Sequence, residues 1–190
     1  MKKAISSIIM LLIVTTTIQS QEALKNVLLD IKLPSSVLVN GTSTLHDWQS
    51  KVEKTDAKIE INNYYNIAIE TLEVKIEAIS IKSGKKLMDK LTYKALKAEE
   101  YPVITFIFKK GEIISENTDS INIKLKGDLT IAGTTKNVAV LTTINKLGNE
   151  ITLIGKHKLK MTDFGIKPPT ALLGTIKTGD EITIEFNLKF

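Results

Sequence analysis

The residues best suited to chemistry in this sequence are its two histidines and its only tryptophan. The stretch GTSTLHDWQS, residues 41–50, brings Ser43, His46, Asp47 and Trp48 close together along the chain. Serine, histidine and aspartate are the parts of a nucleophilic triad, in which the acid orients the imidazole. In a strand, however, His46 and Asp47 point to opposite faces, and Ser43 shares its face with Asp47. The spacing therefore argues against a triad.

A metal site has few candidate ligands. The chain has no cysteine, and its two histidines, His46 and His157, do not form a close pair of the His-x-x-x-His type. The two could still meet across the interior of a barrel, which keeps a metal site open as a minor interpretation. A phosphate-binding loop is not indicated, because GTIKTGDE lacks the glycine–lysine–hydroxyl ending of such loops.

Alternation of apolar and polar residues dominates the chain after its first two dozen residues. INIKLKGDLTIAG, residues 121–133, and EITIEFNLKF, residues 181–190, show the pattern most clearly. This period of two is typical of antiparallel strands with one apolar face and one wet face. Similar runs predict strands at residues 27–33, 46–52, 57–61, 67–81, 103–109, 138–144 and 151–161.

Within residues 67–81 the phase of the alternation slips by one residue between Ile69 and Leu72, which predicts a β-bulge. Turn-forming residues at 62–63, 110–111, 147–149 and 178–180 predict the ends of strands. The stretch SGKKLMDKLTYKALKAEEYP, residues 83–102, breaks the alternation. Its apolar residues recur at spacings of three and four, which predicts a helix.

The composition indicates one globular domain. The 190 residues are 43% hydrophobic and 25% charged. About eight or more strands and one helix predict an all-β fold, either a closed barrel or a sandwich. The net charge is +5, and all basic residues are lysines that alternate with apolar residues. Nucleic-acid-binding proteins concentrate basic residues on one face and use arginine, so we expect no nucleic-acid partner.

Residues 1–20 have the layout of a secretory signal peptide. Lys2 and Lys3 precede a mostly apolar core, residues 4–14, and a short polar run ends at Ser20. We therefore expect a signal peptide at 1–20, a single barrel domain at 21–190, and a soluble mature protein in the periplasm or the medium. An uncleaved membrane anchor is the alternative.

The inward faces of the predicted strands define a candidate ligand pocket. His46 shares strand parity with Trp48, and His157 lies on an apolar face, so each is either a core histidine bonded to the backbone or a hydroxyl, or a polar contact in a cavity. A barrel of about eight strands can hold one ligand in a largely apolar interior. Phe106 and Phe108 could equally face outward. The candidate lining comprises His46, Trp48, Phe106, Phe108, Ile123, Leu125, Leu129, Ile131, His157, Leu159, Met161 and Phe186.

Four stretches also match a known family in its order along the chain. They are GTSTLHDW, ALKAEEYPVITF, KGDLTIAGTTKNVAV and MTDFGIKPPTALLGTIKTGDEITIEFNL. Together they resemble the YceI-like family, the periplasmic polyisoprenoid-binding, lipocalin-like proteins, over residues 25–190. The third stretch is the most specific, because it is similar to the family's G-D-L-T-I-x-G-x-T-K-x-V hairpin.

The resemblance implies an extended lipocalin-like antiparallel β-barrel of about eight strands, with a helical segment near its mouth. It also implies an apolar tunnel that holds an isoprenoid lipid of the quinone or polyprenyl type, with no cofactor and no catalytic residue. Two arginines of better-known members are replaced here by Lys85 or Lys86 and by Met161–Thr162. The resemblance therefore carries no head-group specificity over to this chain.

We therefore expect an exported carrier or storage protein for an isoprenoid lipid, with transient membrane contact for lipid exchange and a homodimer left open. The alternative is a barrel filled by its own side chains, acting as an extracytoplasmic adaptor or stress-related protein without a lipid ligand. We do not expect an enzyme, because catalysis needs several polar groups in one pocket and the sequence provides only His46 and His157 as candidates.

Overall fold

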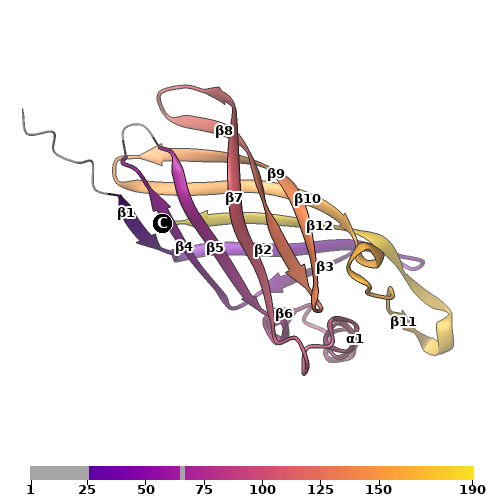
Figure 1. Ribbon diagram of the computed structural model, residues 1–190. Coiled ribbons are helices and arrows are strands. Elements are labelled where there is room, and N and C mark those ends of the chain that lie inside the picture. The colour runs from indigo at the N-terminus through magenta and orange to yellow at the C-terminus, as the bar shows by residue number, and fades with distance from the viewer. Residues whose placement is uncertain (1–25, 65–66) are drawn as a thin grey trace, which may run out of the picture.

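The strands form one antiparallel sheet that curls on itself (Figure 1). The computed structural model describes residues 26–64 and 67–190, so the expected signal peptide at 1–20 lies outside the described residues. The strands are β1 (Val27–Asp30), β2 (Lys32–Ser43), β3 (Trp48–Val52), β4 (Thr55–Ile61), β5 (Ile69–Glu77), β6 (Ile81–Lys82), β7 (Val103–Glu116), β8 (Ser120–Ile131), β9 (Thr134–Leu147), β10 (Glu150–Lys160), β11 (Thr170–Ala171) and β12 (Ile176–Lys189). The helices are α1 (Lys86–Leu96) and three 3₁₀ turns, η1 (Ala78–Ser80), η2 (Met161–Phe164) and η3 (Leu172–Gly174).

One extended run of chain, formed by β1 and β2, closes the sheet into a barrel. β1 pairs with β4, whereas β2 pairs with β12 on one side and with β3 on the other. Ile31, between the two strands, continues the ladder because its N–H donates to the Ala57 carbonyl at 2.9 Å. The described residues form twelve strands, more than the eight or so that the sequence predicts. The difference arises because β1 with β2, β3 with β4, and β5 with β6 are each one interrupted strand of the ring.

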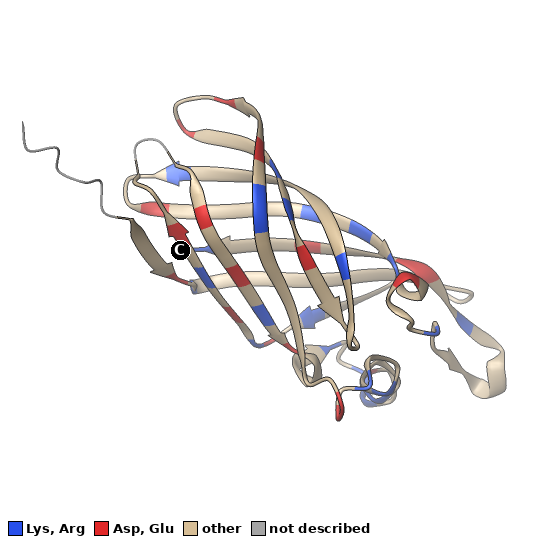
Figure 2. Ribbon diagram, in the orientation of Figure 1, with Lys and Arg blue, Asp and Glu red and all other residues tan. Residues whose placement is uncertain are grey.

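The alternation predicted from the sequence gives the barrel its two faces. Along β8, every second residue from Ile121 to Ile131 is buried, and the residues between them are more exposed. Charged residues are spread along the strands, as Figure 2 shows. Several form ion pairs across neighbouring strands, such as Lys156–Glu185 at 2.8 Å. These pairs are exposed, so each contributes about 0–1 kcal/mol, and burial of the inner face provides most of the stability.

The two ends of the barrel differ in packing. Near the C-terminus and the β9–β10 turn, large side chains less than 2% exposed fill the interior. They are Ile59, Ile61, Ile121, Ile144, Ile151, Leu153 and Phe190. We call this the packed end. At the other end, helix α1 and the segment that carries η2, β11 and η3 lie around the opening (Figure 1).

The structure corrects the predicted boundaries in three places. GTSTLHDWQS is not one strand: β2 ends at Ser43, the chain turns through residues 44–47, and β3 begins at Trp48. The turns expected at 110–111 and 178–180 are wrong, because these residues lie inside β7 and β12, where the strand register shifts. Gly179 lies within the shifted part of β12, whereas the shift in β7 falls at Lys109, next to the expected turn.

Two other local predictions are confirmed. The bulge lies in β5, where the register with β4 shifts between its pairings with Glu60 and Ile61. The predicted helix forms as α1, over the middle of the expected segment. Across residues 26–64 and 67–190, none of the helices has both the length and the apolar character needed to cross a bilayer.

Close strand approach at Gly155 gives a first test of the fold. A Cβ atom there would lie 2.5 Å from Phe186 Cζ and 2.7 Å from the Leu141 carbonyl oxygen. Because the backbone of β9 cannot move aside easily, Gly155→Ala should lower the free energy of unfolding by about 1–3 kcal/mol in denaturant titrations. Lys156→Ala, one residue along on the outer face, is the control and should cost less than about 1 kcal/mol. Equal stability of the two variants would contradict the register of β9, β10 and β12.

Candidate functional site

The hollow end of the barrel contains two chambers that meet. The mouth chamber has a volume of about 350 Å³, and the inner chamber, deeper in the barrel, about 110 Å³. The side chains of Val37, Ile76, Ile104 and Ile184 line both chambers, so the two are adjacent there. Ligand pockets commonly measure about 300–1,000 Å³, and the mouth chamber alone falls in that range. We call the two chambers together the tunnel.

The tunnel is open at one end and blind at the other. Leu153 lines the inner chamber and belongs to the packed end, so the filled interior stops the tunnel there. Met161 lines the mouth chamber at the far end of the same stretch of chain. The span from Leu153 to Met161 is roughly 26 Å at the usual rise per strand residue. An extended hydrocarbon chain that enters from the mouth would therefore end near Leu153.

Trp48 lies flat against the wall of the mouth chamber. It pairs with Gly41 on β2, and a Cβ atom on Gly41 would lie 2.3 Å from the indole Cζ2. The indole Nε1 donates a hydrogen bond to the Thr42 carbonyl at 3.0 Å. The glycine makes room for the ring and the hydrogen bond holds it there, so this large side chain forms part of the wall instead of plugging the opening.

Two phenylalanines of the inner chamber are accommodated in the same way. Phe186 lies over Gly155 and Phe106 over Gly127, and Cβ atoms at these glycines would lie 2.5 Å and 2.6 Å from the respective rings. A larger residue at either position would displace the ring. The three aromatic–glycine contacts therefore help to keep the tunnel hollow.

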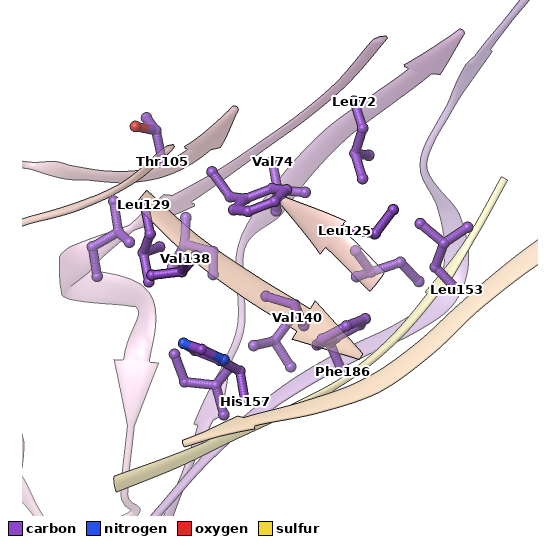
Figure 3. Close-up of a pocket in the computed structure, with 16 residues that line it drawn as sticks. Leu72, Val74, Thr105, Leu125, Leu129, Val138, Val140, Leu153, His157 and Phe186 are labelled. Carbon is purple, nitrogen blue, oxygen red and sulfur yellow. The ribbon is translucent and has the colours of Figure 1, made fainter. Parts of the chain in front are cut away.

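His157 is the polar side chain that points into the inner chamber (Figure 3). Thr105 also lines this chamber, but its hydroxyl points away from the other side chains. Among the described residues, the His157 imidazole has no hydrogen-bond partner. Burial lowers the pKa of His157 from its ordinary value, which favours the neutral ring. A neutral imidazole can donate one hydrogen bond and accept one, so it is available to a polar group that reaches this depth.

His46 lies at the rim of the mouth chamber, in the β2–β3 turn. Its Nδ1 contacts the Asp47 carbonyl oxygen at 2.7 Å, and the Asp47 carboxylate takes no part. Since a carbonyl only accepts hydrogen bonds, Nδ1 is the donor in this contact. Ser43 Oγ binds the backbone of Leu45 and His46 and so shapes the turn.

Helix α1 covers one side of the mouth chamber. Its apolar face, formed by Leu87, Met88, Leu91, Ala95 and Leu96, lines the chamber. The start of the helix is fixed through Asp89, whose carboxylate accepts hydrogen bonds from Ser83 N–H at 2.8 Å and Ser83 Oγ at 2.6 Å. Desolvation opposes ionisation of Asp89, but these hydrogen bonds and nearby Lys82 hold the pKa of the carboxyl below its usual value.

The structure brings ten of the twelve predicted site residues to the tunnel. His46, Trp48, Ile131, Leu159 and Met161 line the mouth chamber, and Phe106, Leu125, Leu129, His157 and Phe186 line the inner one. Phe108 and Ile123 also face inward but pack in the main core and line neither chamber. The two histidines lie in different chambers. No group of three or more histidine and acidic side chains that could hold a metal ion occurs among the described residues.

Several lining residues were not among the candidates chosen from the sequence. They include the apolar face of α1 and the four residues shared by the two chambers. The helix had a usable signal, since its apolar spacing predicts a buried face. The strand residues had only parity, which tells inward from outward but does not distinguish the tunnel from the packed end.

Comparison with known proteins gives one family match. The family model described as "YceI-like domain" matches residues 32–190. No curated protein matches the chain.

Solved structures with the same fold include three from different bacteria. Burkholderia cenocepacia BcnA has a TM-score of 0.69 at 20% identity, covering 82% of this chain and 96% of its own. The Campylobacter jejuni YceI protein has a TM-score of 0.62 at 23% identity, covering 74% and 82%. A polyisoprenoid-binding domain from Saccharophagus degradans has a TM-score of 0.61 at 12% identity, covering 84% and 95%. At these identities the likeness establishes the fold.

The burial of His157 predicts a pH dependence of stability. The unfolded chain takes up a proton near pH 6.5, whereas the folded protein keeps this imidazole neutral until its lowered pKa is reached. The free energy of unfolding should therefore fall as the pH drops from about 6.5 to the folded pKa, and then level off. His157→Leu should remove this component. Denaturant titrations of both proteins between about pH 7.5 and pH 5 measure it. Parallel stability curves for the two proteins would contradict the buried, neutral histidine.

Proposed function

The chain belongs to the family of YceI-like domains, and from that premise we propose that it is an exported carrier or storage protein that holds an isoprenoid lipid in its tunnel. The observation that carries the proposal is a long apolar tunnel that opens at the mouth and ends at the packed end. A linear lipid tail fits this shape better than a compact metabolite does, since every wall of the inner chamber except His157 is apolar where it faces the cavity.

The energetics of burial support a long apolar ligand. Burying one methylene-sized group contributes about 0.8 kcal/mol, so a five-carbon isoprene unit contributes about 4 kcal/mol. Association costs roughly 4–15 kcal/mol in lost freedom of motion, so a few units offset it. Tail length should then determine affinity more than the head group does, which predicts binding of several prenyl lipids.

The isoprenoid class is supported by the neighbour from Saccharophagus degradans, which is described as polyisoprenoid-binding. The mouth chamber has several polar side chains, among them Ser43, His46, Lys85 and Thr92, which suit a polar head group that stays near water. His157 offers one further hydrogen bond to any carbonyl or hydroxyl group that reaches the inner chamber. Quinones and polyprenyl lipids both meet these conditions.

The filled-barrel adaptor is the second candidate, and the chambers weigh against it. An adaptor of this kind would have its whole interior filled by side chains, whereas only the packed end is filled in this way. Catalysis would need polar groups that converge on one substrate, whereas His46 and His157 lie in separate chambers. Export to the periplasm or medium, transient membrane contact and a homodimer stay predictions that accompany the carrier.

The direct test is mass spectrometry of an organic extract from the protein, purified without detergent from the organism that makes it. A prenyl lipid present in proportion to the protein is the expected result, and it would identify the cargo. A protein that carries no lipid and also fails to take up quinones or polyprenols would favour the adaptor.

Narrowing the mouth chamber should weaken uptake. Ala95→Phe adds a ring from helix α1, where a small helical shift can absorb strain more easily than a strand can. We expect affinity for a quinone with a long isoprenoid tail to fall on the order of tenfold, because the ring occupies space that the tail needs. Trp48 in the chamber wall provides the fluorescence signal for the titration.

The matched control is Ala139→Phe, which adds the same ring at an exposed position on β9. It should bind like the parent protein. A quinone without a tail should give little response with any of the three proteins. Equal affinity of the parent and a folded Ala95→Phe variant would argue against the mouth chamber as the entry route.

A further inference from the structure

Four exposed leucines lie on the segments that surround the tunnel mouth. Leu45 is in the β2–β3 turn, Leu87 on α1, and Leu172 and Leu173 in η3 at the tip of the β11–β12 hairpin. Leu45 and Leu87 themselves line the mouth chamber, as do Ala171 and Ile176 beside the hairpin tip. We call these four leucines the rim leucines. Large exposed apolar groups gathered at one opening indicate an interaction surface, whereas isolated ones need no explanation.

The hairpin tip holds its leucines out in an unfavourable backbone conformation. Leu172 and Leu173 have φ angles of 47° and 53°, in the left-handed region that leucine rarely adopts. Leu172 is 67% exposed and Leu173 is fully exposed. Two consecutive strained residues that present apolar side chains to water gain nothing from the fold itself, so the conformation points to a function outside the barrel.

The base of this hairpin is held firmly. Thr170 pairs with Lys177, and the Thr178 N–H donates to the Pro169 carbonyl at 3.0 Å. The hairpin is also tied to the β2–β3 turn, because Thr44 N–H donates to the Lys177 carbonyl at 2.9 Å. The two segments that carry Leu45, Leu172 and Leu173 are therefore fixed relative to each other at the mouth.

Exposed lysines lie on the segments that carry the rim leucines. The three segments 44–47, 85–97 and 164–179 contain seven lysines and two acidic residues, Asp47 and Asp89, and four further acidic residues flank them, Glu99, Glu100, Asp163 and Asp180. The lysines are Lys85, Lys86, Lys90, Lys94, Lys97, Lys167 and Lys177, all exposed, and those of α1 stand out in Figure 2. Exposed leucines among lysines are the combination found in segments that lie in the interface of an anionic bilayer.

We infer that the tunnel mouth docks on an anionic lipid bilayer. The rim leucines enter the boundary between head groups and acyl chains, and the surrounding lysines bind acidic head groups. In this orientation the mouth chamber faces the hydrocarbon layer directly. The inference extends the proposed carrier function, but docking itself does not need a bound cargo and can be measured without one.

The test is sedimentation of the purified protein with vesicles. Mass spectrometry first establishes at which residue the purified protein begins, because an uncleaved apolar N-terminus would itself bind lipid. We expect binding to vesicles of phosphatidylethanolamine and phosphatidylglycerol, and little to vesicles of phosphatidylcholine alone. The binding should weaken strongly between about 0.1 M and about 0.5 M salt, because screening weakens exposed charges.

Replacing both tip leucines, Leu172→Ser with Leu173→Ser, should lower the partition coefficient on the order of tenfold. The matched control is Leu147→Ser, which removes a leucine 79% exposed at the end of β9, at the packed end, and should bind vesicles like the parent. A second variant, Lys86→Glu with Lys90→Glu and Lys94→Glu, should lose the preference for phosphatidylglycerol. Because all these side chains are exposed, the variants should keep the parent's melting temperature.

Two results would overturn the inference. One is a parent protein that does not bind anionic vesicles. This result would stand also if sedimentation without vesicles showed a dimer held together by the rim leucines. The other is a Leu172/Leu173 variant that binds vesicles as well as the parent and the Leu147 control do. Neither result touches the proposed cargo, because the Trp48 titration with a prenyl quinone is done without vesicles.

Discussion

Closure of the barrel depends on one run of chain, residues 27–43, that hydrogen-bonds to strands on both sides. β1 joins β4 and β2 joins β12, so neither partner is left as an open edge. An open edge would expose unpaired backbone groups and admit water to the interior. Once the ring is closed, every inward side chain faces other inward side chains. Whether the interior is filled or empty at a given depth then depends on the size of the inward-facing side chains at that depth.

The difference between the two ends follows from that constraint. Isoleucines from four strands and the terminal Phe190 fill one end. Toward the mouth, strand positions that could carry another large residue are glycines, and Gly41, Gly127 and Gly155 each give room to an aromatic ring from a nearby strand. The ring then lies along the wall. Large aromatic residues are therefore compatible with a hollow interior in this barrel, because each ring lies against a glycine.

Strand parity explains what could be predicted from the sequence and what could not. Parity is local, so alternation along 121–131 and 182–190 identified inward residues correctly, and the phase slip near residue 70 identified a real bulge. Depth along the barrel is not local, because it depends on register between strands far apart in the chain. This is why Ile123 and Leu125, two residues apart on one face, lie outside and inside the tunnel. In the sequence, the glycines within β7 and β12 resemble turn residues. Only the pairing with neighbouring strands shows that the strands continue through them with a shift of register.

A tunnel that is apolar along its length limits how any apolar cargo can leave. The free energy gained by burying a tail must be returned if that tail enters water, so release into solvent becomes slower as the tail lengthens. Release into another apolar phase at the mouth avoids most of this cost, because the tail is never fully hydrated. Apolar walls that bind an apolar tail therefore favour its release into another apolar phase at the rim. Exposed leucines and lysines lie on the segments around that rim, where such an acceptor would have to be.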